Sequence, residues 1–313
     1  MKNCFLTFFL AMALLTSCMN LPVTEIEIEI PEAETHLVLH AHLVDTDSVI
    51  TAHLYKSTNF FERDTLGDKL IGNLPNGNVE LHDADNLISA LKHLPDEERK
   101  GATIINYSDT LPHKLGDYGQ TITIRATHPD YPPLTATQTF PNFVPITSAK
   151  LVRNAGTDYW DGTSTDGIEV TLNDPADESN YYQVSFLGYP GPSHSSEYSS
   201  ISFLSNAPAL DMQDALEDGI GREFAYLSDE TFNGASFHFS AYFREQTAEY
   251  DTIYVRWRAI TKEWYEFIRS SEEQFRLNGF LGNYAEPFNV ISNIEGGHGI
   301  FGLGRERLFV VSE

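Results

Sequence analysis

The sequence predicts a mainly β protein, with an N-terminal β-sandwich of the immunoglobulin or transthyretin type followed by a second β-rich domain that carries one helix. Apolar and polar residues alternate over many short segments, as they do in strands that bury one face. Turn-forming residues separate these segments at short intervals, which is typical of a sandwich. The alternation changes once to a helical spacing, over residues 261–277.

The N-terminal domain is predicted over residues 25–143. Its first strand is the alternating Glu/Ile run at residues 25–30, and turn signals such as Asn76-Gly77 separate the later strands. Residues 89–100 interrupt the alternation and are interpreted as a helix-like insertion. The other strands are expected at residues 37–43, 49–55, 78–81, 120–127 and 134–140.

The second domain is predicted over residues 144–313, because prolines at 141 and 145 bracket a short non-helical stretch. Residues 261–277 are expected to form a helix that packs on the second sheet, and residues 188–208, rich in Ser, Gly and Pro, are expected to form a long exposed loop. The residues predicted to face the second core are Ile168, Val170, Leu172, Tyr182, Val184, Phe186, Phe237, Phe239, Ala241, Phe243, Ile253, Val255, Trp257 and Ala259.

The first 18 residues have the pattern of a bacterial lipoprotein signal. Lys2 precedes an apolar run that ends at Leu15-Thr16-Ser17-Cys18, and this run is too short for a bilayer span of roughly 20 residues. The pattern predicts a signal peptide at 1–17, lipidation of Cys18 and a tether at 18–24. The alternative is an ordinary signal peptide with an incidental cysteine.

The charge of the chain is strongly acidic. Without residues 1–17, which contain one base and no acid, 19 bases stand against 45 acids, a net charge of −26. Such a surface repels phosphate backbones, so nucleic acid is not expected as a partner. Solubility accounts for the acidity more simply than a dedicated cation-binding role.

Several segments resemble one bacterial family. They are the early Glu/Ile strand with Pro31-Glu32-Ala33-Glu34, the pair Asn173-Asp174-Pro175 and Asn180-Tyr181-Tyr182, the run 228–234, Ile253-Tyr254-Val255-Arg256 before the helix, and, most specifically, the run 286–302. In these the chain resembles the Bacteroidota lipoprotein family catalogued as domain of unknown function 4249. The resemblance implies an outer-membrane location, on the periplasmic or the surface side, and a TonB-dependent transporter as a possible partner. It implies no mechanism.

Histidines give the weak candidates for a metal site. His36, His40 and His42 share one face of a predicted strand and His53 lies on the next, a spacing at which imidazoles can share a metal. The simpler interpretation is a solvent-facing polar side, and no metal or other cofactor is expected.

Three further motifs do not indicate a functional site. Gly297, Gly299 and Gly302 match a dinucleotide fingerprint in spacing, but no strand-to-helix crossover follows them, so tight turning and close backbone approach are expected instead. The acidic turns at 45–47 and 83–86 lack the rest of a calcium loop. No catalytic motif stands out, and the protein is not expected to be an enzyme.

The expected function is therefore binding beside a TonB-dependent transporter. Within the segment 188–208, Tyr189, Tyr198 and Phe203 are the candidates for contact with a ligand or partner, because tyrosine suits adaptable recognition. The alternative is an envelope assembly or surface adhesion protein without a small-molecule ligand. A hydrolase is a weaker third alternative, which would need a pocket lined by carboxylates.

Overall fold

The structure is a computed structural model, and it describes residues 34–57, 74–95, 105–157, 162–191, 197–212, 221–244, 247–281 and 289–312. Residues from Thr35 onward form one compact unit. The predicted signal peptide, Cys18, the tether and the strand at 25–30 lie outside the described residues, and so do parts of the segment 188–208.

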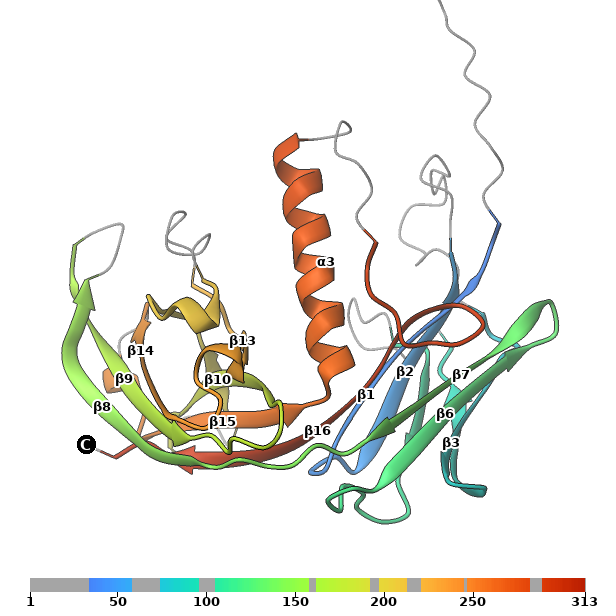
Figure 1. Cartoon of the computed structure of the whole chain (residues 1–313), viewed down its shortest axis with the longest axis horizontal. Helices are drawn as coiled ribbons and strands as arrows, with labels where there is room; N and C mark the ends of the chain where they lie inside the picture. Colours follow the sequence, from blue (N-terminus) through green and yellow to red (C-terminus); the bar gives the residue numbers. More distant parts are fainter. Residues whose placement is uncertain are drawn as a thin grey trace, which may run out of the picture. The chain divides into compact units, whose positions relative to one another are not determined.

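The described residues are mainly β, as predicted (Figure 1). The strands of the N-terminal half are β1 (Leu37–Val44), β2 (Val49–Lys56), β3 (Asn78–Asp83), β4 (Asn86–His93), β5 (Tyr107–Thr110), β6 (Thr121–His128) and β7 (Tyr131–Thr139). The C-terminal half contains β8 (Ile146–Thr157), β9 (Ser164–Asn173), β10 (Tyr181–Tyr189), β11 (Ser199–Ile201), β12 (Phe203–Leu204), η1 (Pro208–Leu210), β13 (Ala225–Ser228), η2 (Asp229–Thr231), β14 (Ser236–Phe243), η3 (Thr247–Glu249), β15 (Thr252–Ile260), α3 (Lys262–Leu281) and β16 (His298–Val310).

The strands form two sheets in the part of the chain that the structure describes. The larger has the order β11-β10-β15-β16-β1-β2-β5-β4-β3-β6-β7, with β13 paired to β10, and the smaller has the order β12-β14-β9-β8. Strand β16 joins the two halves of the chain. Its first part runs parallel to β1, and its second part runs antiparallel to β15.

The N-terminal core lies between two parts of the larger sheet. One part contains β16, β1 and β2, and the other contains β3, β6 and β7. The alternation predicted for β1 is confirmed, since Leu37, Leu39, Ala41 and Leu43 are all buried. The neighbouring strand β2 and strands β3 to β7 supply further buried residues, and β16 adds Phe301 and Leu303 from the far end of the chain. The N-terminal core is therefore completed by the last strand.

The C-terminal core lies between the smaller sheet and strands β10 and β15. The fully buried Trp257 stacks on Tyr182 with ring centroids 4.8 Å apart, and its indole Nε1 donates a hydrogen bond to the Val144 carbonyl at 2.9 Å. All but one of the residues predicted to face this core are buried, the exception being the half-buried Phe237.

Helix α3 packs on the larger sheet, on the face opposite the two cores. It follows β15 and contacts β10 and β16 (Figure 1). Its side chains Trp264 and Phe267 also lie against His42 and His40 of β1. The glycine at 302 in β16 leaves room for the indole, because a Cβ there would lie 2.9 Å from Trp264 ring carbons. The first turn of the helix is thus seated where β16 changes its pairing from β1 to β15.

Two local predictions are wrong. Over residues 89–93, the helix-like insertion predicted at 89–100 is instead part of the strand β4, which pairs with β3 and with the start of β5. Residues 96–100 lie outside the described residues. The segment 188–208 is not an exposed loop throughout, since Ile201 and Phe203 in β11 and β12 are fully buried. In both places tertiary pairing overrides the local composition, because an alternation of only a few residues is enough to join an existing sheet.

Candidate functional site

The predicted histidine face is covered by α3 and does not face solvent. His40 and His53 are cross-strand partners on β1 and β2, and Tyr55 lies beside both, with its hydroxyl 3.4 Å from the His40 Nε2. The His42 ring lies 4.4 Å, centroid to centroid, from that of Trp264, and its Nε2 is closed off from solvent without a hydrogen-bond partner. Among the described residues no three histidine, cysteine or acidic side chains come close enough to hold a metal together.

Covering by the helix also changes the ionisation of these rings. Burial lowers the pKa of His40, and burial together with the nearby His40 and Arg258 lowers the pKa of His42 to about 3. Both rings are therefore neutral in the folded protein at neutral pH. They act as packing groups for the first turns of α3.

We expect the free energy of unfolding to fall as the pH is lowered from 6.5. The unfolded chain binds a proton at residue 42 below pH 6.5, whereas the folded chain does so only near pH 3, so stability is lost across that window. The expected loss of unfolding free energy from His42 between pH 6.5 and 4.5 is roughly 2 kcal/mol. Urea unfolding at both pH values measures it.

Two variants make this test specific. His42→Gln removes the titrating group and is expected to flatten the pH dependence. His113→Gln changes an exposed histidine and is expected to leave the dependence as steep as in the unaltered protein. Equal slopes for His42→Gln and the unaltered protein would contradict the assignment.

The acidic turn at 45–47 is a structural connection. The Asp47 carboxylate accepts a hydrogen bond from the Val44 N–H at 2.7 Å, and the Asp45 carboxylate accepts one from the Glu306 N–H at 2.8 Å and one from Arg307 at 2.6 Å. The Asp47 carboxylate closes the turn on itself, and the Asp45 carboxylate ties the end of β1 to β16. The turn interpretation fits them better than a calcium loop.

The motif residues around Asp174 and Asp229 come together in space. The Tyr182 hydroxyl donates a hydrogen bond to the Asp174 carboxylate at 2.6 Å, and the Asn180 N–H donates one to the Asp229 carboxylate at 2.7 Å. Burial raises the pKa of Asp174, and the negative charge of Asp229 raises it further. The pair is buried and locks the turn before β10 to the turn after β13, which is a structural role.

The glycines of the 297–302 run serve close backbone approach, as predicted. A Cβ at residue 299 would lie 2.0 Å from the Leu39 carbonyl oxygen, and one at residue 297 would lie 2.3 Å from the Leu37 carbonyl oxygen. Both glycines lie beside β1, and no helix follows them in the described residues.

An exposed cluster of aromatic and aliphatic side chains lies on the larger sheet, and we call it the tyrosine patch. Tyr198 brings its ring to 5.7 Å from Tyr189 and 5.5 Å from Tyr254, between centroids. Val310 is the cross-strand partner of Tyr254, and Leu308 lies two residues away on the same face of β16. The side chains of Tyr198, Leu308 and Val310 are 49%, 42% and 63% exposed. The patch thus presents apolar area to solvent across three strands.

The structure divides the three predicted contact residues. Tyr189 and Tyr198 are neighbours in the tyrosine patch, but Phe203 packs in the C-terminal core against Phe186, with centroids 4.7 Å apart. The prediction of an exposed Phe203 is therefore wrong. The contributions of β15 and β16 to the patch were not predicted from the sequence. The sequence indicates these contributions only by the apolar residues Tyr254, Leu308 and Val310, which occupy strand positions where alternation would place polar residues facing solvent.

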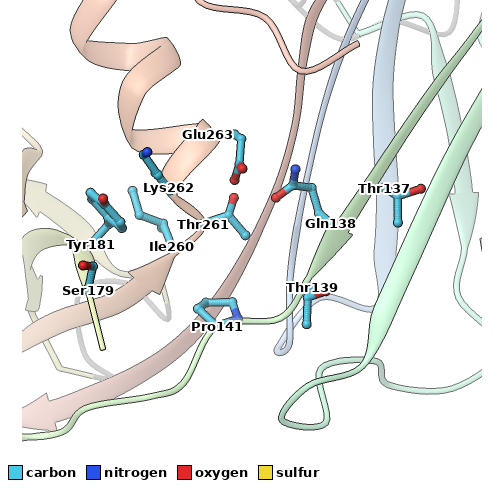
Figure 2. A pocket seen from close by; sticks show the side chains of 10 residues that line it. All are labelled: Thr137, Gln138, Thr139, Pro141, Ser179, Tyr181, Ile260, Thr261, Lys262 and Glu263. Atoms are coloured by element: carbon cyan, nitrogen blue, oxygen red, sulfur yellow. The ribbon is translucent and has the colours of Figure 1, made fainter. Parts of the chain in front are cut away.

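A shallow polar pocket of about 330 Å³ lies at the start of α3 (Figure 2). One side consists of Thr137, Gln138 and Thr139 of β7, and the other consists of residues 260–263 and Tyr181, with Ser179 and Pro141 completing the lining. Glu263 is the single carboxylate among these residues. Glycoside hydrolysis uses two facing carboxylates, and the hydrolase alternative called for a pocket lined by carboxylates, which this pocket is not.

The comparison with protein families decides the relationship of the chain. A family model described as a domain of unknown function, DUF4249, matches residues 23–307. The chain belongs to the DUF4249 family. The match covers the smaller sheet, α3 and the larger sheet as far as Arg307 of β16. Leu308 and Val310 of the tyrosine patch lie beyond the matched residues. A search of curated proteins found no match to the chain.

Proposed function

We propose that the protein is a lipid-anchored outer-membrane binding protein that acts beside a TonB-dependent transporter without catalysing a reaction. The lipobox ending at Cys18 supports the anchor, and the outer-membrane role beside a transporter follows from what the family resemblance implies. In the part of the chain that the structure describes, no helix has the length and apolar character needed to span a membrane. The proposed attachment is the lipid on Cys18, which the lipobox predicts.

The observation that carries the binding role is the tyrosine patch. A contiguous patch of solvent-exposed apolar side chains indicates an interaction surface, whereas single exposed apolar residues are ordinary. Tyrosine rings supply contact area at low entropic cost, and the aliphatic Leu308 and Val310 extend that area along β16. Anchoring confines the protein to the membrane plane, which raises the effective concentration of a barrel partner held there.

We expect the patch to be required for co-purification of a β-barrel transporter in mild detergent. The double variant Tyr198→Ser and Leu308→Ser removes exposed apolar contacts, and its yield of transporter is expected to fall by about tenfold at native expression. Quantitative mass spectrometry of the purified material measures this yield. Point variants are preferable to deleting the segment 188–208, because deletion would remove the buried Ile201 and Phe203.

A matched double variant serves as the control. Tyr118→Ser and Leu87→Ser change a tyrosine and a leucine that are 69% and 56% exposed in the N-terminal half, and they are expected to leave the yield unchanged. Cys18→Ala is expected to release the protein from membranes and to lower the yield. If no barrel co-purifies above a control lipoprotein, the transporter role is wrong. If the two double variants behave alike, the partner stands and the patch is not its site.

A further inference from the structure

Strand β7 is an edge strand that is paired along only part of its outer side. Thr135 exchanges two backbone hydrogen bonds with Glu295, at 3.1 and 2.8 Å, as in a pair of antiparallel strands. Because backbone groups point to the same side at every second residue, the N–H and C=O groups of Thr137 and Thr139 also point outward.

The segment before Glu295 does not continue this pairing. Instead, the Asn293 side chain makes two hydrogen bonds to the backbone of Phe301 at 2.8 and 2.9 Å. The Ile291 N–H donates a hydrogen bond to Ser270 of α3 at 2.9 Å. The chain thus turns away from β7, and within the described residues no backbone hydrogen bond is made to the outward groups of Thr137 and Thr139.

The space left beside these two residues is the polar pocket (Figure 2). Its opposite wall is the end of β15 and the first turn of α3, where Thr261, Lys262 and Glu263 lie, and the Tyr181 ring stands nearby. The pocket is therefore a slot with a strand edge on one side and polar side chains on the other. Its volume of about 330 Å³ suits a few residues of an extended chain rather than a globular surface.

We propose that this slot binds an extended polypeptide segment of a partner protein, which adds as a strand to β7 at Thr137 and Thr139. Unpaired N–H and C=O groups that alternate along a strand edge recognise another extended backbone, largely independently of its side chains. The Thr135–Glu295 bridge already sets the antiparallel register that an added strand would follow. The polar walls select small polar or uncharged side chains over large apolar ones. This site is separate from the tyrosine patch and does not depend on the proposed transporter.

The probe for the test is the blocked hexapeptide acetyl-Ser-Thr-Thr-Ser-Thr-Ser-amide, added to the mature chain without its lipid. Amide hydrogen exchange at Thr137 and Thr139 is expected to slow by about tenfold at millimolar peptide, because these donors gain a partner. The exchange rate of the Gln138 backbone N–H, which points toward β6, is expected to change little. The fully N-methylated peptide keeps the side chains but removes every N–H, and it is expected to give no protection.

Two variants locate the donors. Thr137→Pro removes one outward N–H at an edge position where proline is tolerated, and the peptide is expected to bind at least about tenfold more weakly. Thr137→Ala keeps that N–H and is expected to bind as the unaltered protein does. If the proline variant fails to fold, the exchange measurement on the unaltered protein still tests the proposal. Absence of protection at Thr137 and Thr139, equal protection by the N-methylated peptide, or unchanged binding by a folded Thr137→Pro overturns the proposal.

Discussion

The excised N-terminal half, residues 34–143, is expected to show no cooperative thermal unfolding. In the intact chain β1 pairs with β16 along its whole length, from Val38 with His298 to Val44 with Gly304. Excision removes this pairing and takes Phe301 and Leu303 out of the core, so the facing side chains of β1 become accessible to water. Each buried aromatic or leucine side chain contributes roughly 1.5–3 kcal/mol, and the fragment also loses a strand's hydrogen bonds.

A longer fragment provides the control. Residues 289–304 joined behind residue 143 through a Gly/Ser linker restore the parallel strand and both core residues, and cooperative unfolding is expected to return. Circular dichroism and differential scanning calorimetry measure both fragments. Cooperative melting of the shorter fragment at the temperature of the intact protein would contradict this view, and it would mean that residues 34–143 are an autonomous domain after all.

The fold class could be predicted because its signal is local. The alternation of Leu37, Leu39, Ala41 and Leu43 depends only on the period of two along one strand, and the structure confirms it. The partner of that strand could not be predicted in the same way. The Asp45–Glu306 hydrogen bond joins residues 261 positions apart, and no local pattern records which strand lies beside which. The predicted domain boundary at residues 143 and 144 stays a prediction, because the last strand serves both cores.

The candidate site was predicted in part for the same reason. Tyr189 and Tyr198 are close in sequence and lie in one segment whose composition predicts contact residues. Tyr254 and Val310 come beside them only through the register of three paired strands, which the sequence does not show. Phe203 was misjudged because Ser, Gly and Pro around it indicate a loop, yet it pairs with Phe243 in a sheet. The histidine face was misjudged because a strand's polar side can be covered by a second layer, here α3, that the strand itself does not specify.

Replacing Gly299 with alanine is expected to lower the free energy of unfolding by roughly 3–4 kcal/mol or more, since two penalties combine. The backbone at this residue has φ +118°, a conformation that side-chain-bearing residues rarely adopt. The added Cβ would also lie 2.0 Å from the Leu39 carbonyl oxygen and 2.9 Å from the His40 ring. Relief of that clash requires β1 and β16 to separate at the start of their pairing, where the N-terminal core is closed.

Gly119→Ala measures the cost of the positive φ angle without the cost of a steric clash. Gly119 has φ +77° but no atom within 4 Å of an added Cβ, so the expected loss is only about 1–2 kcal/mol. Urea unfolding of both variants at pH 7 gives the comparison. A larger loss at residue 299 would assign the glycine-rich run of this family to strand packing, because the extra cost comes from contact with β1. Equal losses of unfolding free energy in the two variants would mean that β1 and β16 can move apart at residue 299 at little cost. The close approach of the two strands would then not explain why glycine is present there.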